Sequence, residues 1–148
     1  PISQEVDGFD LLLEQMARRY VRLLLEIDSV SQTARMREAF AMTDIGFYQK
    51  FRKRHIDSEN IQDAIDDGLN RTVIVESADR ISESNGTFQY AVDFVQIDKR
   101  HGEIIDEKKL RAYLSITTRP HEVRAAEKFE NPFGIRILDL ILKPRSNS

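Results

Sequence analysis

Three polar residues interrupt apolar segments in the second half of the chain, and they are the first candidates for chemistry. They are Asp93, Tyr113 and Asp139. A carboxylate held in an apolar cavity can have a raised pKa and act as a general base. Tyr113, however, alternates with Arg111 and Ser115, which is typical of a solvated strand face. Two hypotheses follow: a small enzyme or ligand binder that uses Asp93 or Asp139 in a cavity, or polar residues on the outer face of a sheet.

Other catalytic patterns are missing from the sequence. The three histidines, His55, His101 and His121, lie in charged segments without a partner at metal-ligand spacing. The chain has no HExxH, nucleophile elbow or glycine-rich phosphate loop. We therefore expect no enzymatic activity, no cofactor and no metal, and we expect the function to lie in a surface and its partners.

Composition limits the classes of protein that fit. A length of 148 residues favours one domain, and 41% apolar with 32% charged residues suits a globular fold. The net charge of −3 argues against non-specific nucleic-acid binding. The absence of cysteine excludes disulfides and thiolate zinc sites.

The apolar runs are too short to cross a membrane. Residues 11–13 and 23–25 are all leucine, but Glu14, Arg18 and Arg22 interrupt the apolar pattern around them. The chain begins with Pro1 and enters a helical pattern at once. We expect it to be the soluble portion of a longer protein, whose missing N-terminal part would hold a membrane anchor.

The first half of the sequence predicts helices. Apolar residues recur at helical spacing over residues 9–27, while Leu11 and Leu25 lie off this stripe. The helix thus has either a wide core face or a second face for a partner. A capping box at residues 29–32 begins a second predicted helix, which runs to about Met42.

Two further helices are predicted before residue 70. Thr43 or Asp44 caps the third, which ends in a basic cluster at residues 52–55 that is either a solvated helix end or a patch for an acidic partner. Asp57 or Ser58 caps the fourth, over residues 59–69.

The second half predicts an antiparallel meander. Alternating apolar residues over 71–82, 87–98 and 108–119 are separated by turn signals at Asn85-Gly86 and His101-Gly102. A last strand over residues 134–143 is apolar on both faces, which predicts that both are covered, either by the chain's own helices or by another molecule. Helices followed by strands indicate an α+β fold with N-terminal helices packed on a curved four-stranded antiparallel sheet.

The last strand follows a stiff corner. Asn131, Pro132, Phe133 and Gly134 include three turn formers in four positions, because asparagine bonds its own backbone, proline fixes φ and glycine tolerates positive φ. So rigid a corner indicates that the position of the last strand matters.

These features together resemble the periplasmic domain of the eighth VirB component of type IV secretion systems. That family carries an Asn-Pro-x-Gly motif before its final strand, and Asn131, Pro132 and Gly134 match it. Tyr20-Val21 resembles the start of the family's first-helix signature, and Asp28 its closing residue. Residues 44–53 resemble its short aromatic and basic helix.

The resemblance implies a cone fold like that of nuclear transport factor two, forming one periplasmic-type domain over residues 1–148. It implies a non-enzymatic assembly factor of a secretion or conjugation channel, attached to the bacterial inner membrane. The expected partners are other channel components and a second copy in a weak homodimer. The expected structural and interface residues are Asn131, Pro132, Phe133, Gly134, Tyr20, Val21 and Asp28.

Overall fold

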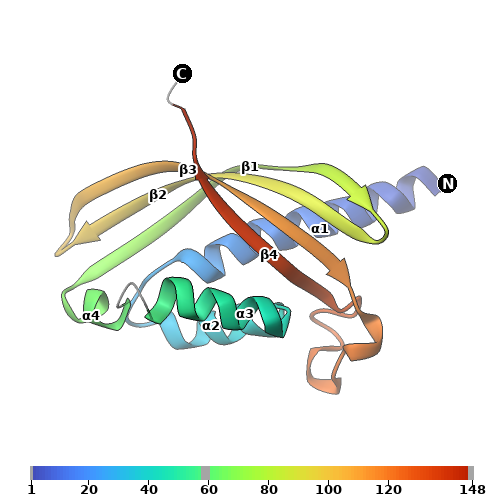
Figure 1. Ribbon diagram of the computed structural model, residues 1–148, viewed down its shortest axis with the longest axis horizontal. Helices are drawn as coiled ribbons and strands as arrows, with labels where there is room; N and C mark the ends of the chain where they lie inside the picture. Colours follow the sequence, from blue (N-terminus) through green and yellow to red (C-terminus); the bar gives the residue numbers. More distant parts are fainter. Residues whose placement is uncertain (1, 58–60, 147–148) are drawn as a thin grey trace.

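Four helices precede four strands in the computed structural model, which describes residues 2–57 and 61–146, with side chains from residue 8 to 54 in the first part (Figure 1). The helical elements are α1 (Ile2–Leu25), α2 (Gln32–Ala41), α3 (Ile45–Phe51), a π-helical extension of α3 (Arg52–Asp57) and α4 (Ile61–Asp66). The strands are β1 (Leu69–Ser84), β2 (Thr87–Arg100), β3 (Glu103–Thr118) and β4 (Ile135–Pro144).

The sheet is the predicted antiparallel meander, with the order β1-β2-β3-β4. Both hairpin turns have two residues with positive φ: Asn85 and Gly86 at 52° and 79°, and His101 and Gly102 at 52° and 81°. Two-residue turns of this kind match the twist of the strands they join. The sequence signals therefore gave the correct hairpins, and the strands extend further toward the turns than expected.

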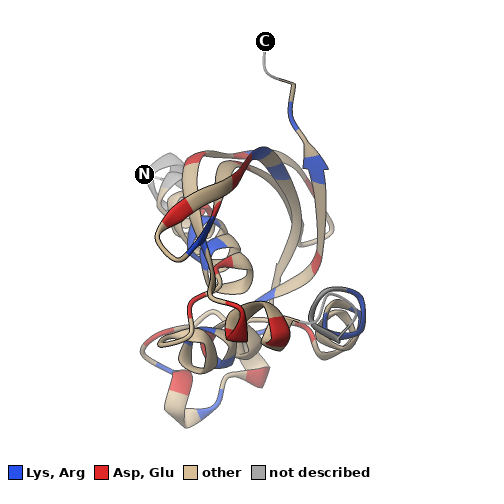
Figure 2. Ribbon diagram, turned by 90° about the vertical axis from the view of Figure 1, so that its left-hand side faces the viewer, with Lys and Arg blue, Asp and Glu red and all other residues tan. Residues whose placement is uncertain are grey.

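Extra residues in the strands bend the sheet. The register slips at four places, leaving Glu76 and Ile81 of β1, Ile105 of β3 and Leu138 of β4 without a partner across the ladder. Bulges increase twist and bend the strand that carries them. Figure 2 shows the result as an arch, with helices below its open side.

The bulge in β4 changes which residues enter the core. Before Leu138 the inward residues are Ile135 and Ile137, and after it the inward residue is Leu140; all three are at most 4% exposed. Ile141 is 49% exposed on the other side. The extra residue shifts the alternation by one and directs both apolar sets to one face. The chain's own helices leave Ile141 exposed, so cover of this face by another molecule, the other alternative, stays a prediction.

Helix α1 supplies the central face of the core. Its residues Leu13, Ala17, Tyr20 and Val21 are fully buried against the concave side of the sheet. Leu25, which lies off the predicted stripe, is also buried, whereas Leu11 is 54% exposed. The wide core face is therefore the better description of the C-terminal half of α1.

Loop segments pair with both edges of the sheet. Ile27 exchanges two backbone hydrogen bonds with Arg71 of β1, at 3.1 and 2.8 Å. At the other edge, Ile137 of β4 donates to the Met42 carbonyl at 2.7 Å and accepts from the Asp44 N–H at 2.9 Å. The two loops that follow α1 and α2 thereby fix the helices to the sheet.

The helix caps differ in part from expectation. Asp44 caps α3 as predicted, accepting a hydrogen bond from the Phe47 N–H at 3.2 Å. The residue before α2 is Ser31, and the Gln32 side chain accepts from the Asp28 N–H instead of that of Ser29. Helix α4 begins in the described part of the chain at Ile61 and ends at Asp66. Its predicted caps, Asp57 or Ser58, lie outside the residues whose side chains are described.

Candidate functional site

The Asn131 side chain organises the corner before β4. Its Nδ2 donates to the Ile135 carbonyl at 3.1 Å, and its Oδ1 accepts from the Ile135 N–H at 2.9 Å. The Gly134 N–H donates to the Asn131 carbonyl at 3.1 Å and closes a tight turn around Pro132 and Phe133. Asparagine is needed because only an amide offers a donor and an acceptor side by side. With 6% exposure, it satisfies buried backbone groups that water does not reach.

Gly134 joins the corner to the end of β3. Its φ is +61°, and its carbonyl accepts from the Arg119 N–H at 2.7 Å. A Cβ atom at this position would lie 2.2 Å from the Arg119 carbonyl oxygen. Glycine is therefore required both for the backbone conformation and for the close approach.

Arg119 extends this connection to the helices. Its guanidinium donates to the Asp44 carboxylate at 2.9 Å, and Asp44 is the cap of α3. This hydrogen bond, with the backbone N–H of Phe47 adding to it, holds the pKa of Asp44 below its usual value although burial opposes the shift. A continuous set of hydrogen bonds thus runs from the corner to the helical layer.

A buried arginine fixes the connector before the corner. Arg136, 8% exposed, donates to the Glu127 carboxylate at 3.1 Å, and that carboxylate also accepts from the Arg124 N–H at 3.0 Å. The Asn131 N–H donates to the Glu127 carbonyl at 2.8 Å. This ion pair could not be predicted from the sequence, because residues 121–130 have the composition of a solvated loop.

An aromatic cluster lies where the corner meets α1. We use this name for Phe9, Phe88 and Phe133. The Phe9 ring stands edge-on to Phe88 at 5.7 Å and to Phe133 at 5.9 Å between centroids. Phe133 is 46% exposed and Pro132 is exposed beside it. The corner therefore holds an apolar surface against α1 that solvent can reach.

The signature residues of α1 are internal. Tyr20 and Val21 have no exposed surface. The Thr43 hydroxyl donates to the Ala39 carbonyl at 2.6 Å, so the Tyr20 hydroxyl, 2.8 Å from the Thr43 oxygen, is the donor to it. Burial raises the pKa of Tyr20, which keeps the hydroxyl neutral. Tyr20 therefore ties α1 to the segment that pairs with β4.

Asp28 organises the turn between α1 and α2. Its carboxylate accepts from the Ser31 hydroxyl at 2.8 Å and from the Val30 N–H at 3.4 Å. The hydrogen bond from Ser31 is the main cause that lowers the pKa of Asp28. An ionised Asp28 thus stabilises the start of α2.

The two carboxylates proposed for catalysis do not enter a cavity. Asp93 lies on the side of β2 opposite the buried Val92 and Phe94, and Arg111 donates to both of its oxygens at 2.5 and 3.0 Å. The hydrogen bond from Arg111 lowers the pKa of Asp93, the reverse of what a general base needs. Asp139 is exposed and accepts from the Leu140 N–H. The hypothesis of a general base at Asp93 or Asp139 is therefore wrong.

Within residues 2–57 and 61–146, no group of His, Asp or Glu side chains has the arrangement of a metal site. His101 occupies the β2–β3 turn and the His121 side chain is 78% exposed. The side chain of His55 lies outside the described residues.

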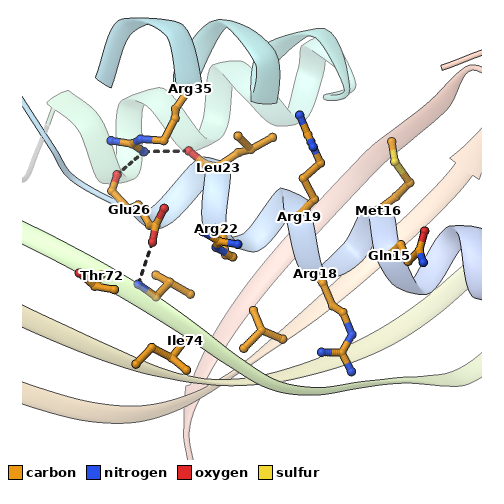
Figure 3. Close-up of a pocket in the computed structure, with 12 residues that line it drawn as sticks. Gln15, Met16, Arg18, Arg19, Arg22, Leu23, Glu26, Arg35, Thr72 and Ile74 are labelled. Atoms are coloured by element: carbon orange, nitrogen blue, oxygen red, sulfur yellow. Dashed lines mark hydrogen bonds between the residues drawn. The ribbon is translucent and has the colours of Figure 1, made fainter. Parts of the chain in front are cut away.

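The hollows between helices and strands include one beside α4 and one along α1. The first, about 520 Å³, lies between the ends of α1, α2 and α4 and the strands. Its polar lining includes Gln96 and Arg71, and Arg71 donates to both oxygens of Asp98, at 2.8 and 3.1 Å. The second is a groove of about 970 Å³ between α1 and β1, drawn in Figure 3. A cavity between the curved sheet and the helices was part of the enzyme hypothesis, but Asp93 and Asp139 do not line either hollow. The groove along β1 was not predicted, since it depends on elements far apart in the chain.

Known proteins match this chain in sequence profile and in fold. The sequence profile described as "VirB8 protein" matches residues 3–140. A search of curated protein sequences gave no match.

Solved structures give close matches in fold. The soluble domain of TrwG, of the type IV secretion machinery of Bartonella grahamii, superposes with a TM-score of 0.76 at 18% identity, covering 93% of this chain and 96% of that one. CagV, a VirB8 homolog from Helicobacter pylori strain 26695, gives 0.70 at 14% identity, with 92% and 99% covered. The periplasmic domain of DotI gives 0.72 at 13% identity, with 92% and 96% covered.

The fold expectation is confirmed by these matches. The chain has the nuclear-transport-factor-two-like arrangement of helices followed by a curved four-stranded antiparallel sheet. In the parts of the chain that the structure describes, no helix is both long and apolar enough to span a bilayer.

Proposed function

Because the chain belongs to the VirB8 protein family, we propose that it is the periplasmic domain of an assembly component of a type IV secretion or conjugation channel. Its role is to hold other channel components, and a second copy of itself, through protein contacts without catalysis. Family membership supports the secretion system, and the ion pair of Asp93 with Arg111 and the exposure of Asp139 support a role without catalysis.

The observation that carries this proposal is the rigid support beneath an exposed apolar surface. Asn131 and Gly134 fix the corner by backbone hydrogen bonds, and the corner places Phe133 against Phe9 of α1. An apolar side chain held in one position loses little conformational entropy when a partner binds it. The arrangement suits recognition by shape.

Within this proposal the corner residues divide into two roles. Asn131 and Gly134 are buried and act as supports, whereas Pro132 and Phe133 are exposed and make the contact. Tyr20, Val21 and Asp28 position the helices behind this surface. The aromatic cluster is small, so self-association through it is weak and reversible, as assembly requires.

The proposed location is the periplasm, with the domain attached to the bacterial inner membrane by a segment before Pro1. The similar DotI structure is that of a periplasmic domain and the TrwG structure that of a soluble domain, which supports this placement. Sequencing the gene upstream of Pro1 tests it: an apolar run of about 20 residues is expected there.

Complementation in a strain that lacks the gene tests the function. Phe133→Glu in the full-length protein is expected to abolish secretion or conjugative transfer while the domain stays folded. Phe129→Glu is the matched control, since Phe129 is 87% exposed and its ring contacts Lys128, the neighbouring residue. Normal transfer by the Phe133 variant and by Asn131→Ala, together with a monomer at high concentration, would overturn the proposal.

A further inference from the structure

The outer edge of β1 is only partly used. Arg71 pairs outward with Ile27, so the alternation of a strand directs the N–H and C=O groups of Val73 and Val75 outward as well. The Val73 N–H donates to the Glu26 carboxylate at 3.1 Å. The backbone N–H and C=O of Val75, which also point away from β2, form no hydrogen bond with any group in residues 2–57 and 61–146. An edge with open backbone groups is a template for another strand.

The side chain of Glu26 shows which chemistry this edge accepts. It comes from the end of α1 and places a carboxylate oxygen where a pairing strand would present its carbonyl. The next outward position along β1, Val75, lies beside the same groove. An acidic group is therefore already bound at one end of the open edge.

Helix α1 lines the other side of the groove with arginines. Gln15, Arg18, Arg22 and Glu26 recur at helical spacing and face β1, and Figure 3 shows Arg18 extending toward the strand. Arg18 pairs with Glu14 at 3.3 Å, and Arg19 pairs with Glu38 of α2.

The charge of the lining is positive on balance. Its charged residues are four arginines, Arg18, Arg19, Arg22 and Arg35, and one acid, Glu26. The Arg35 guanidinium donates hydrogen bonds to the backbone carbonyls of Leu23 and Glu26. Arg22 is exposed, and the described part of the chain shows no carboxylate within ion-pair distance of it. With the ion-pair partners Glu14 and Glu38 included, the four arginines meet three acids, so the groove keeps one net positive charge in a chain whose net charge is −3.

We propose that this groove binds an extended acidic segment of another secretion-channel component, which adds as a fifth strand beside β1. The backbone of the segment pairs with Val75, and its Asp or Glu side chains meet Arg18 and Arg22 of α1. The inference rests on the proposed function, because it names the kind of partner that the domain holds.

The dimensions of the groove fit such a segment. Arg18 and Arg22 lie about 6 Å apart along α1, within a lining that runs from Gln15 to Glu26 over about 16 Å. An extended chain covers that length in about five residues. Alternate side chains of a strand point to opposite faces, so acidic residues at every second position would face α1. Ile74 lines the groove and is 49% exposed, so it offers an apolar contact to the side chains of the bound strand that point away from α1.

Fluorescence anisotropy with defined peptide pools tests the proposal. The probe is a labelled pool of heptapeptides with Asp or Glu at alternate positions and Val, Ile, Thr or Ser between them. A pool with Lys at the acidic positions is the control for charge. The acidic pool with N-methylated alternate amides is the control for backbone pairing. Vesicles of phosphatidylglycerol and inorganic phosphate test whether the groove is only a site for anions.

The expected result is saturable binding of the acidic pool, at least tenfold tighter than that of the lysine or N-methylated pool. Arg22→Glu is expected to weaken it at least tenfold. Arg37→Glu, an exposed arginine of α2 outside the groove, is expected to leave it unchanged. Amide exchange followed by NMR is expected to slow at Val75 when the peptides bind.

Equal binding of the three pools, unchanged exchange at Val75, or binding of vesicles and phosphate with equal sensitivity to Arg22→Glu would overturn the proposal. Such a failure is distinguishable from failure of the proposed function. A domain that binds no acidic peptide but loses transfer through Phe133→Glu is still an assembly component, and only the groove is then unassigned.

Discussion

The guanidinium of Arg119 donates a 2.9 Å hydrogen bond to the carboxylate of Asp44, although the two residues are 75 positions apart. Arg119 also pairs through its backbone with Gly134, and Asp44 pairs through its backbone with Ile137. The start of β4 is therefore held from two sides, by the end of β3 and by the cap of α3. A change at either residue should reach the corner.

Asp44→Asn is expected to lower the stability at neutral pH by about 1 kcal/mol, because asparagine keeps the cap of α3 but loses the charge that pairs with Arg119. The folded pKa of Asp44 lies below that of the unfolded chain, so the unfolded state takes up the proton first. The pair therefore stabilises the fold above the unfolded pKa of about 3.9, and the effect is lost as pH falls through the folded pKa.

Urea unfolding of both proteins at pH 7 and pH 2.5 measures this difference. The gap in the free energy of unfolding between wild type and Asp44→Asn should narrow at the lower pH, which is below the unfolded pKa of about 3.9. A gap of the same size at both values would show that the Arg119 pair is not its cause.

Asn131→Ala is expected to destabilise the domain by about 2–4 kcal/mol. The change leaves the buried Ile135 N–H without a partner, which costs about 1–3 kcal/mol, and removes one of the two side-chain hydrogen bonds to the Ile135 carbonyl, which keeps its bond from Arg136 at 3.1 Å. Chemical denaturation followed by circular dichroism measures the loss. Pro132→Ala, at an exposed neighbouring position, is the control and should cost less than about 1 kcal/mol.

Gly134→Ala is expected to prevent correct docking of β4. The added Cβ would meet the Arg119 carbonyl at 2.2 Å, in addition to the cost of about 1 kcal/mol for positive φ. Gly86→Ala is a matched control, because Gly86 has φ +79° and open space around its Cβ position. Thermal unfolding should show a much larger decrease for Gly134→Ala, and equal decreases would mean that the close approach is unimportant.

Self-association is expected to depend on the aromatic cluster. Sedimentation over a concentration series should show a weak dimer for wild type and a monomer for Phe133→Glu. Phe129→Glu should behave as wild type, because Phe129 lies outside the cluster. A dimer that persists in the Phe133 variant would place the interface elsewhere.

Local signals in the sequence predicted much of the fold. Asn85-Gly86 and His101-Gly102 specify two-residue turns through their own conformational preferences, so the meander could be inferred without any tertiary information. The bulge at Leu138 could not, because an extra residue in a strand has no reliable signal in composition. The sequence pattern therefore did not show that the core-facing residues of β4 change alternation at Leu138.

The corner was predicted as rigid, but its connections were not. The residue types of Asn131 and Gly134 indicate a turn, whereas the contacts with Arg119 and Glu127 depend on how distant segments meet. The same limit applies to the groove, since Arg18 and Arg22 look like a solvated helix face until β1 is placed beside them.

The two ways in which strands join this sheet have a kinetic consequence. β1, β2 and β3 are linked by two-residue turns, and such hairpins form in about 1–10 μs. β4 pairs with β3 only after the segment from Arg119 to Gly134 closes and residues 42–44 arrive from the helices. We therefore expect β4 to dock late in folding, so that substitutions at Asn131 accelerate unfolding more than they slow folding. When mechanical force is applied to the domain, β4 would then be the first strand to separate from the sheet.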